Sequence, residues 1–413
     1  MINFKQYILQ ESVDATNKHL THLDELILTK GYAGGEKTIE YINKLLEMLQ
    51  GHTEQPINVS AKWDGAPAIV CGRDAHGKFF IGTKSVFAAD AKLNYSIKDI
   101  RKNHGDAPGL VEKLEYAFDV LRRVNFDGVY QGDLLFWPGL VQSYRIAGDD
   151  YIGFRPNTIL YTVAVDSAEA KKILASKIGV VFHTKYAVTT DETGKLKFIG
   201  KQFGIRVDHL RTNGAYIRDA LFDNQAGTIS LTQQETTMVK KTVDHMQYVL
   251  NAINFSVVDK KMSDMINIFI NSQIRRGQFL DDVTTSVDEF KQWVAARYDA
   301  EITKLKRKES KTAAKEQFLE TLDRYVDSLI NLFKFIKEAK AVKDVFIQKY
   351  NAIMQGAAIG TYLVYPNGDI RVTNPEGYVA FDAAQNGIKL VDRLEFSRAN
   401  QIIPKNWIKD ENV

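Results

Sequence analysis

The stretch NVSAKWDGAPAIVCGRDAHGKFFIGTKSVF, residues 58–87, alternates apolar and polar residues in the manner of short strands. Lys62 and Asp64 interrupt this pattern just before Gly65. A cation and a carboxylate in so apolar a neighbourhood have two explanations. They form either the solvated end of a strand followed by an Asp-Gly turn, or a site in which Lys62 is an activated nucleophile.

The bulk composition indicates an ordinary folded protein. Of the 413 residues, 45% are hydrophobic and 25% are charged, and the net charge of +3 does not indicate a non-specific polyanion binder. Cys71 is the single cysteine, so we expect a buried thiol and no disulfide-linked partner. We find no signal-peptide pattern and no run of about 18 apolar residues, and therefore expect a cytoplasmic protein without a membrane partner.

Helical periodicity predicts two helical regions in the chain. Residues 1–55 form an N-terminal helical segment, in which 11–31 and 36–51 carry apolar residues at three- and four-residue spacing and end on glycine. Residues 212–356 are helical throughout. Because strands precede and follow this block, it reads as a large all-α insertion.

Residues 56–211 and 357–413 carry the pattern of an α+β domain. The separation of short strands mostly by turns favours an antiparallel-rich sheet, with one helix over 108–124. The sequence PNGD at 366–369 predicts a hairpin. The expected strands are 57–63, 67–73, 78–83, 128–137, 157–166, 178–188 and 195–200.

Three further pieces break apolar strands with chemistry-bearing residues. They are Gly132-Asp133 in GVYQGDLLFW, Glu376-Gly377 in NPEGYVAF, and Lys389 in GIKLVDRLEFS. Buried carboxylates are costly unless a cation accompanies them, and Mg²⁺ held by one or two carboxylates and phosphate oxygens is a natural partner.

Taken in order with NTILYTVAVD at 157–166, these pieces resemble motifs I, III, IIIa, IV and V of the covalent nucleotidyltransferase superfamily. That superfamily contains the ATP-dependent DNA and RNA ligases and the mRNA capping enzymes. The resemblance covers residues 57–200 and 360–398 and implies a ligase-type (ATP-grasp-like) domain. The whole chain also resembles an uncharacterised family encoded by large tailed bacteriophages, which would place it in the cytoplasm of an infected bacterium.

The resemblance assigns the two lysines to catalysis. Lys62 would attack the α-phosphate of ATP and hold AMP as a phosphoramidate, and Lys389 would contact the same phosphate. A free lysine has a pKa of about 10.4, so the pKa of Lys62 must be lowered by burial or by a nearby cation such as Lys389 or Mg²⁺.

The resemblance also assigns nucleotide contacts. Glu376 and Asp133 would hold Mg²⁺ or contact the nucleotide, and Asp64-Gly65 would orient the lysine or the nucleotide. Three further contacts are expected from Lys84 on phosphate or sugar, Tyr161 on the adenine face, and Arg393 in place of a missing second motif V lysine. Tyr161 is equally compatible with core packing.

The arrangement favours an RNA ligase over a DNA ligase. Only residues 390–413 follow Lys389, too few for the barrel that follows motif V in DNA ligases. The helical block carries NSQIRRGQF at 271–279 and KLKRKESK at 304–311, which could grip a polynucleotide with a 5′-phosphate end. Two alternatives remain: nucleotidyl transfer to a protein or small molecule, and an inactive nucleic-acid-binding or virion protein of the same fold.

Overall fold

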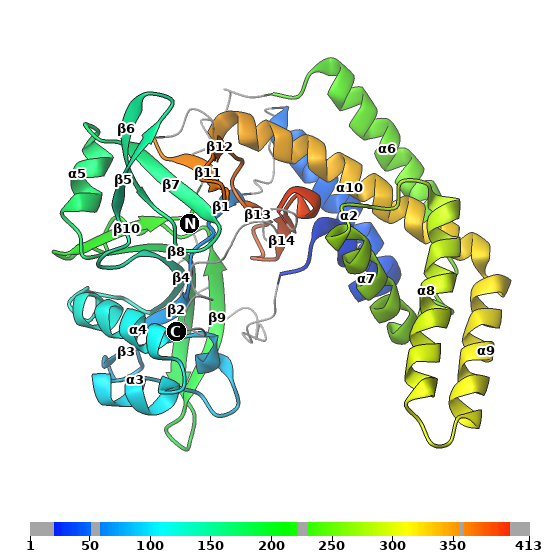
Figure 1. Cartoon of the computed structure of the whole chain (residues 1–413), viewed down its shortest axis with the longest axis horizontal. Coiled ribbons are helices and arrows are strands. Elements are labelled where there is room, and N and C mark those ends of the chain that lie inside the picture. Colours follow the sequence, from blue (N-terminus) through cyan, green and yellow to red (C-terminus); the bar gives the residue numbers. More distant parts are fainter. Residues whose placement is uncertain (1–19, 51–57, 222–229, 355–357, 397–413) are drawn as a thin grey trace.

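A computed structural model describes residues 20–50, 58–221, 230–354 and 358–396 of the chain. Figure 1 shows a strand-rich part on the left and a group of helices on the right. The expectation of an antiparallel-rich mixture of strands and helices with an N-terminal helical segment is confirmed. Within the described residues, no helix is long and apolar enough to cross a membrane.

The strands form three sheets. A six-stranded sheet has the order β10-β8-β4-β2-β3, with β9 paired to β8. A five-stranded sheet has the order β12-β11-β7-β6-β5, and a three-stranded sheet has the order β1-β13-β14. The strands are β1 (Asn58–Lys62), β2 (Ala68–Arg73), β3 (Phe79–Gly82), β4 (Val129–Phe136), β5 (Gln142–Ile146), β6 (Asp149–Phe154), β7 (Ile159–Ala164), β8 (Ile178–Thr190), β9 (Leu196–Phe203), β10 (Ala215–Asp219), β11 (Gly360–Val364), β12 (Ile370–Val372), β13 (Gly377–Phe381) and β14 (Gly387–Leu390).

The helices fall into two groups. Short ones accompany the sheets: η2 (Lys84–Phe87), α3 (Ile97–His104), α4 (Pro108–Leu121) and α5 (Ala168–Leu174). The others form the helical part: η1 (Leu23–Glu25), α2 (Leu26–Leu49), α6 (Gln233–Asn251), α7 (Lys260–Arg275), α8 (Val283–Thr303), α9 (Glu309–Arg324) and α10 (Val326–Met354).

Apolar packing covers much of the six-stranded sheet. Ile100 of α3 and Leu114 of α4 pack in one buried cluster with strands β2, β4 and β8. On the other side of β4, Phe136 contacts Phe154 of the five-stranded sheet, with ring centroids 5.1 Å apart. Cys71, predicted to be a buried thiol, is buried in β2.

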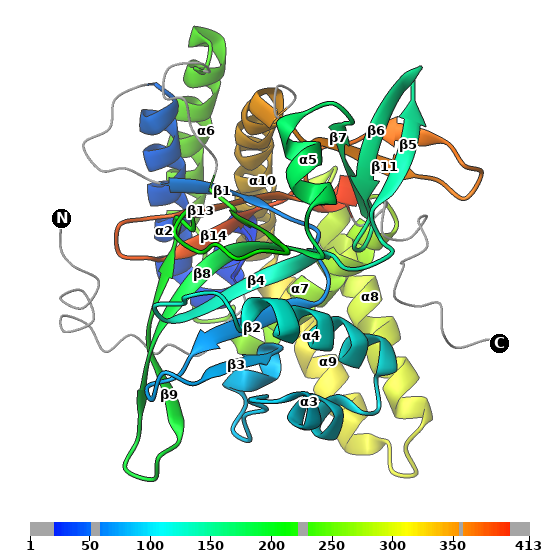
Figure 2. The ribbon, with the colours of Figure 1, turned by 90° about the vertical axis from the view of Figure 1, so that its left-hand side faces the viewer.

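The helical part has its own core around α10. Phe333 and Phe335 of α10 are fully buried, as are Phe269 of α7 and Phe290 of α8. Helix α2 contacts α6, α7 and α10, so the N-terminal helix packs with the inserted helices in one apolar cluster. Figure 2 shows β1, β13 and β14 between this helical part and strands β4 and β8.

Most expected elements are present. Helix α4 confirms the helix predicted over 108–124, and the β11–β12 hairpin closes through a hydrogen bond from the Tyr365 amide to the Asp369 carbonyl, 2.8 Å long. Gly368 adopts φ +88°, the left-handed conformation that glycine favours in such turns. The hairpin predicted from PNGD is therefore confirmed.

Two expectations are wrong. Among the described residues, the helix predicted over 11–31 is helical only from residue 23, because His22 is extended and forms a bridge with Lys389; residues 11–19 lie outside the described part. The block predicted to be helical from residue 212 begins with strand β10, which pairs in parallel with β8. Pairing with a distant strand, which local periodicity does not encode, decides both cases.

Candidate functional site

Strands β1, β13 and β14 of the three-stranded sheet bring the motif residues that they carry close together. Lys62 ends β1 opposite Gly377 of β13, and Val379 of β13 lies opposite Lys389 of β14. Glu376, just before β13, forms an ion pair with the Nζ of Lys62. Sequence positions more than three hundred residues apart thus meet at one end of this sheet.

The glycines of the motifs allow close approach. A Cβ on Gly65 would lie 2.5 Å from the Cβ of Asp133, and one on Gly377 would lie 2.6 Å from the carbonyl oxygen of Leu390. A Cβ on Gly132 would overlap the carbonyl oxygen of Val181. Since real Cβ contacts are longer than these, each glycine lets its backbone approach a neighbouring strand more closely than any other residue could.

Asp64 acts as a clamp for a neighbouring loop. The carboxylate is buried and accepts hydrogen bonds from the Nδ2 of Asn157 at 2.7 Å and from the amides of Thr158 at 2.7 Å and Ile159 at 2.9 Å. Its own amide donates to the hydroxyl of Tyr161 at 2.7 Å. These bonds fix the turn that follows Lys62.

A cavity of about 270 Å³ lies beside this turn. Lys62, Lys84, Asp133 and Lys389, all predicted site residues, line it. Other lining residues include Leu20, Gln131, His183, Thr184, Tyr186, Lys201 and Val379. Four lysines face two carboxylates, Asp133 and the Glu376 that pairs with Lys62, so the cavity carries a net positive charge when His183 is neutral.

A β-bulge supplies His183 to the cavity. Gln131 of β4 lies opposite Thr184, whereas the next residue, Gly132, lies opposite Phe182, so His183 is an extra residue in β8. Because the bulge shifts the alternation, His183 and Thr184 both line the cavity. The His183 Nδ1 lies 2.7 Å from the hydroxyl of Thr184, and its Nε2 lies 3.9 Å from Oδ2 of Asp133.

Burial shifts the protonation of the acidic and imidazole groups. Burial, against the attraction of Lys62, raises the pKa of Asp133 to about 7. Burial and the charges of Lys62 and Lys84 lower the pKa of His183 to about 4. Burial likewise raises the pKa of Glu376. The carboxyl groups therefore hold protons more readily than they do in water.

Lys389 has a lowered pKa. Burial is the largest cause and the nearby charge of Lys62 is the next. An amine in such surroundings loses its proton more readily than a free lysine does.

Several predicted nucleotide contacts lie elsewhere. Tyr161 is buried against Trp63, with ring centroids 4.8 Å apart, and lines a second cavity of about 170 Å³ that Lys62 also lines. Arg393 is buried in ion pairs with Asp24 and Glu25. Neither lines the larger cavity. Asp64 and Gly65 do not line it either and make the contacts given above.

Little in the sequence indicates the remaining lining residues. His183 interrupts the apolar run IGVVFHTKYAV in the way Asp133 interrupts its strand, and that break was a usable signal. Leu20, Gln131 and Lys201 have no local pattern that predicts a site.

A divalent cation would need help from a substrate to bind here. No group of three or more His, Cys, Asp or Glu side chains is placed to hold a metal among the residues that the structure describes. Asp133 faces the cavity and could bind Mg²⁺ together with phosphate oxygens, as Mg²⁺ sites commonly do. Glu376 is engaged by Lys62 and would have to leave it first.

Comparisons with known proteins give a family but no activity. No curated protein and no solved structure shows significant similarity to the chain. A family model described as "Family of unknown function (DUF6267)" matches residues 17–405, nearly the whole length. The chain belongs to this family.

Proposed function

We propose that the protein is an ATP-dependent nucleotidyltransferase of the RNA ligase type, in which Lys62 carries AMP covalently. One observation carries the proposal. Lys62, Lys84, Asp133 and Lys389 line a single cavity, and Glu376 pairs with Lys62, although these residues come from five separate segments. The resemblance of those segments to the ligase motifs supports the same reading.

The chemistry requires a neutral amine on Lys62. Glu376 contacts this amine and, because burial raises its pKa, is suited to accept the proton. The nitrogen then attacks the α-phosphorus, a P–N bond forms, and the P–O bond to the leaving pyrophosphate breaks. In the second step, an oxygen of a 5′-phosphate attacks the same phosphorus, and the P–N bond breaks as Lys62 recovers its proton.

The remaining cations suit a triphosphate. Lys84, Lys201 and Lys389 line the cavity and would stabilise negative charge that develops on the phosphoryl oxygens. Bound Mg²⁺, held by Asp133 and phosphate oxygens, would supply further charge neutralisation.

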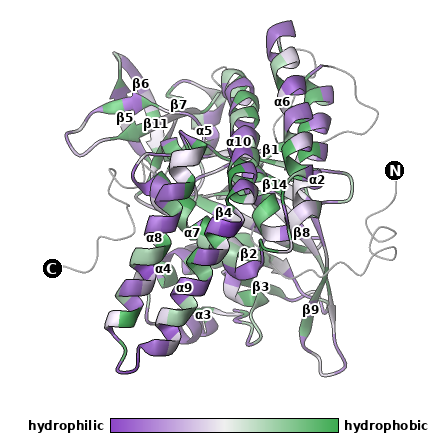
Figure 3. Ribbon diagram, turned by 90° about the vertical axis from the view of Figure 1, so that its right-hand side faces the viewer, coloured by the Kyte–Doolittle hydropathy of each residue, from purple (hydrophilic) through white to green (hydrophobic). Residues whose placement is uncertain are grey.

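The helical part supports a polynucleotide as the acceptor. Lys304, Lys306, Arg307 and Lys308 are exposed at the turn between α8 and α9, and hydrophilic residues are frequent along both helices in Figure 3. Such a basic turn can contact phosphates without reading sequence. We take RNA as the substrate because the resemblance favours RNA ligases, and we place the reaction in the bacterial cytoplasm, where ATP is available.

The decisive experiment is covalent labelling. The pure protein is incubated with α-labelled ATP and Mg²⁺, and label that survives denaturing electrophoresis is measured. We expect label on the wild type, none on Lys62→Ala, and full label on Lys197→Ala, a control at an exposed lysine of β9. Absence of label on the wild type, or its persistence on Lys62→Ala, would overturn the proposal.

A second step identifies the acceptor. Labelled protein, freed of ATP, is mixed with 5′-phosphorylated RNA, with 5′-phosphorylated DNA, or with RNA that ends in a 5′-hydroxyl. We expect label to move to the phosphorylated RNA alone. Label that stays on the protein with all three would rule out strand ligation and leave transfer to another target.

A further inference from the structure

A short N-terminal segment lies along the free edge of β14, next to Lys389. The amide of Lys389 donates to the carbonyl of Thr21 at 2.9 Å, and His22 forms a parallel bridge with Lys389. Leu20, at the start of this segment, lines the larger cavity. The strand that carries Lys389 is therefore held from outside by residues remote in sequence.

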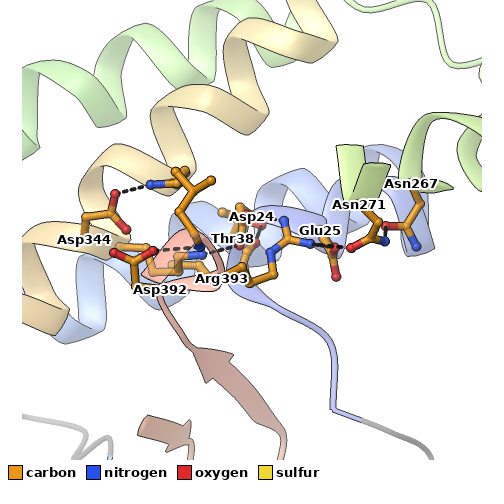
Figure 4. A network of polar contacts seen from close by, with 12 residues as sticks. Asp24, Glu25, Thr38, Asn267, Asn271, Asp344, Asp392 and Arg393 are labelled. Atoms are coloured by element: carbon orange, nitrogen blue, oxygen red, sulfur yellow. Dashed lines mark hydrogen bonds and ion pairs between the residues drawn. The ribbon is translucent and has the colours of Figure 1, made fainter. Parts of the chain in front are cut away.

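The segment ends in a buried network of charges, shown in Figure 4. Asp24 is completely buried and pairs through Oδ2 with Nη2 of Arg393 at 2.9 Å. Its other oxygen, Oδ1, pairs with Nζ of Lys343 in α10 at 2.8 Å, and Arg393 also pairs with Glu25. Asp24 thus joins α10 to Arg393.

The network closes a loop around Lys389. Arg393 lies four residues after Lys389 and is anchored on Asp24, while Thr21, three residues before Asp24, binds the Lys389 amide. The backbone that carries Lys389 is consequently fixed on both sides by one short segment. A shift of Asp24 would move both attachments together.

Stability alone gives a weak reason for these charges. Charges are expensive to bury, and well-packed apolar side chains of similar volume commonly stabilise a fold at least as well. Buried ion pairs do impose a defined geometry, because each carboxylate oxygen has its own partner at a fixed distance. Here Oδ1 and Oδ2 of Asp24 each have one.

We propose that Asp24 is a positioning residue that, held by Lys343 of α10, sets the place of Lys389 in the nucleotide cavity; this inference rests on the proposed function. The helical part and the cavity are then mechanically linked. An acceptor that moved α10 would act on Lys389 through Asp24.

The test is a double-mutant cycle on the rate of label transfer to Lys62 in a single turnover at saturating ATP. We expect Asp24→Asn and Lys343→Met each to slow this step about tenfold to a hundredfold, the size of a small misplacement of a reacting group. Lys343→Arg, which keeps the charge, should recover most of the rate. In a Lys389→Met background, Asp24→Asn and Lys343→Met should cause no further loss.

The control separates positioning from general destabilisation. Leu332→Ala removes a fully buried side chain of α10, three helical turns from Lys343. It should lower the unfolding temperature at least as much as Asp24→Asn, yet keep the wild-type labelling rate below that temperature. Two results would overturn the inference. One is a double variant, Asp24→Asn with Lys389→Met, whose labelling rate falls by the product of the two single losses; the other is a Leu332→Ala variant that slows labelling as much as Asp24→Asn does.

A second readout needs no enzymatic activity. Acetylation of lysine amines by acetic anhydride, followed by peptide mass spectrometry, compares the reactivity of Lys389 with that of exposed Lys197. Asp24→Asn and Lys343→Met should change the relative reactivity of Lys389 several-fold, and Leu332→Ala should leave it unchanged. Unchanged reactivity of Lys389 in both network variants would refute the positioning role, whether or not ATP labels the protein. Absence of ATP labelling would by itself refute only the proposed function.

Discussion

Replacement of Asp64 tests whether this motif residue is a structural clamp. In Asp64→Ala, the amides of Thr158 and Ile159, both almost fully buried, lose their common acceptor. An unsatisfied buried donor costs about 1–3 kcal/mol, and the bond from Asn157 is lost as well. We therefore expect the free energy of unfolding to fall by about 3–6 kcal/mol.

Asp64→Asn should be much milder. Its amide oxygen can accept from Thr158 and Ile159, and its NH₂ can donate to Asn157 once that side chain turns its own oxygen around. What is lost is the extra strength of bonds to a charged acceptor, about 1–3 kcal/mol in all. We therefore expect Asp64→Ala to destabilise the protein much more than Asp64→Asn does.

Urea unfolding followed by tryptophan fluorescence measures both changes, because Trp63 adjoins Asp64. Asp166, exposed at the end of β7, provides the matched control, and its changes to Ala and Asn should stay within about 0.5 kcal/mol of wild type. An Asp64→Ala variant within about 1 kcal/mol of wild type would refute the clamp. Equal damage from Asn and Ala would show that the charge, rather than the bonding pattern, matters.

Three further predictions concern the same region. Gly132→Ala should destabilise the protein by several kcal/mol because its Cβ would meet the Val181 carbonyl, whereas Gly109→Ala in α4, with nothing within 4 Å, should change stability by at most about +1 kcal/mol in the same urea assay. Tyr161→Phe leaves the Asp64 amide without its acceptor and should cost about 1–3 kcal/mol; an unchanged unfolding midpoint would contradict the bond. The pKa of Asp133 is raised from 3.8 to about 7, so the folded state binds its proton more tightly and wild-type stability falls as pH rises through that window. As pH rises from 4 to 8, the free energy of unfolding of the wild type should fall by a few kcal/mol relative to that of Asp133→Asn. Parallel pH curves for the two proteins would be inconsistent with the raised pKa.

Local patterns predicted the elements well where the elements are local. The period of the apolar residues indicated α4 and the helices of the central block, and the turn residues indicated the β11–β12 hairpin. The pattern failed at residues 20–22 and 215–219, where pairing with a distant strand decides the conformation. The 3.6-residue period continues into the first of these segments, so no window of sequence could have separated it from α2.

The candidate site was predictable in part for the same reason. Lys62, Asp133, Glu376 and Lys389 stood out because each breaks an apolar strand, and the structure brings all four together. Arg393 was expected from the resemblance alone, as a substitute for a second motif V lysine, and it is paired with Asp24 and Glu25 instead. A charge that breaks an apolar pattern indicates that some partner exists, and only the fold tells whether that partner is another side chain or a ligand.

A buried aspartate and a half-buried one show the difference. The Asp64 carboxylate already accepts hydrogen bonds from three donors of its own chain, 2.7–2.9 Å away, so it can accept few further bonds from a substrate. Asp133 faces a cavity, and the Nε2 of His183 stands 3.9 Å from its nearer oxygen, beyond hydrogen-bond reach. Partial or full burial makes the carboxylate expensive in both places; at Asp133, the attraction of Lys62 and Lys84 offsets part of this cost, yet desolvation still raises its pKa. Under the proposed function, a cation that binds together with a phosphate would lower the remaining cost of this carboxylate, and the energy recovered would contribute to the affinity.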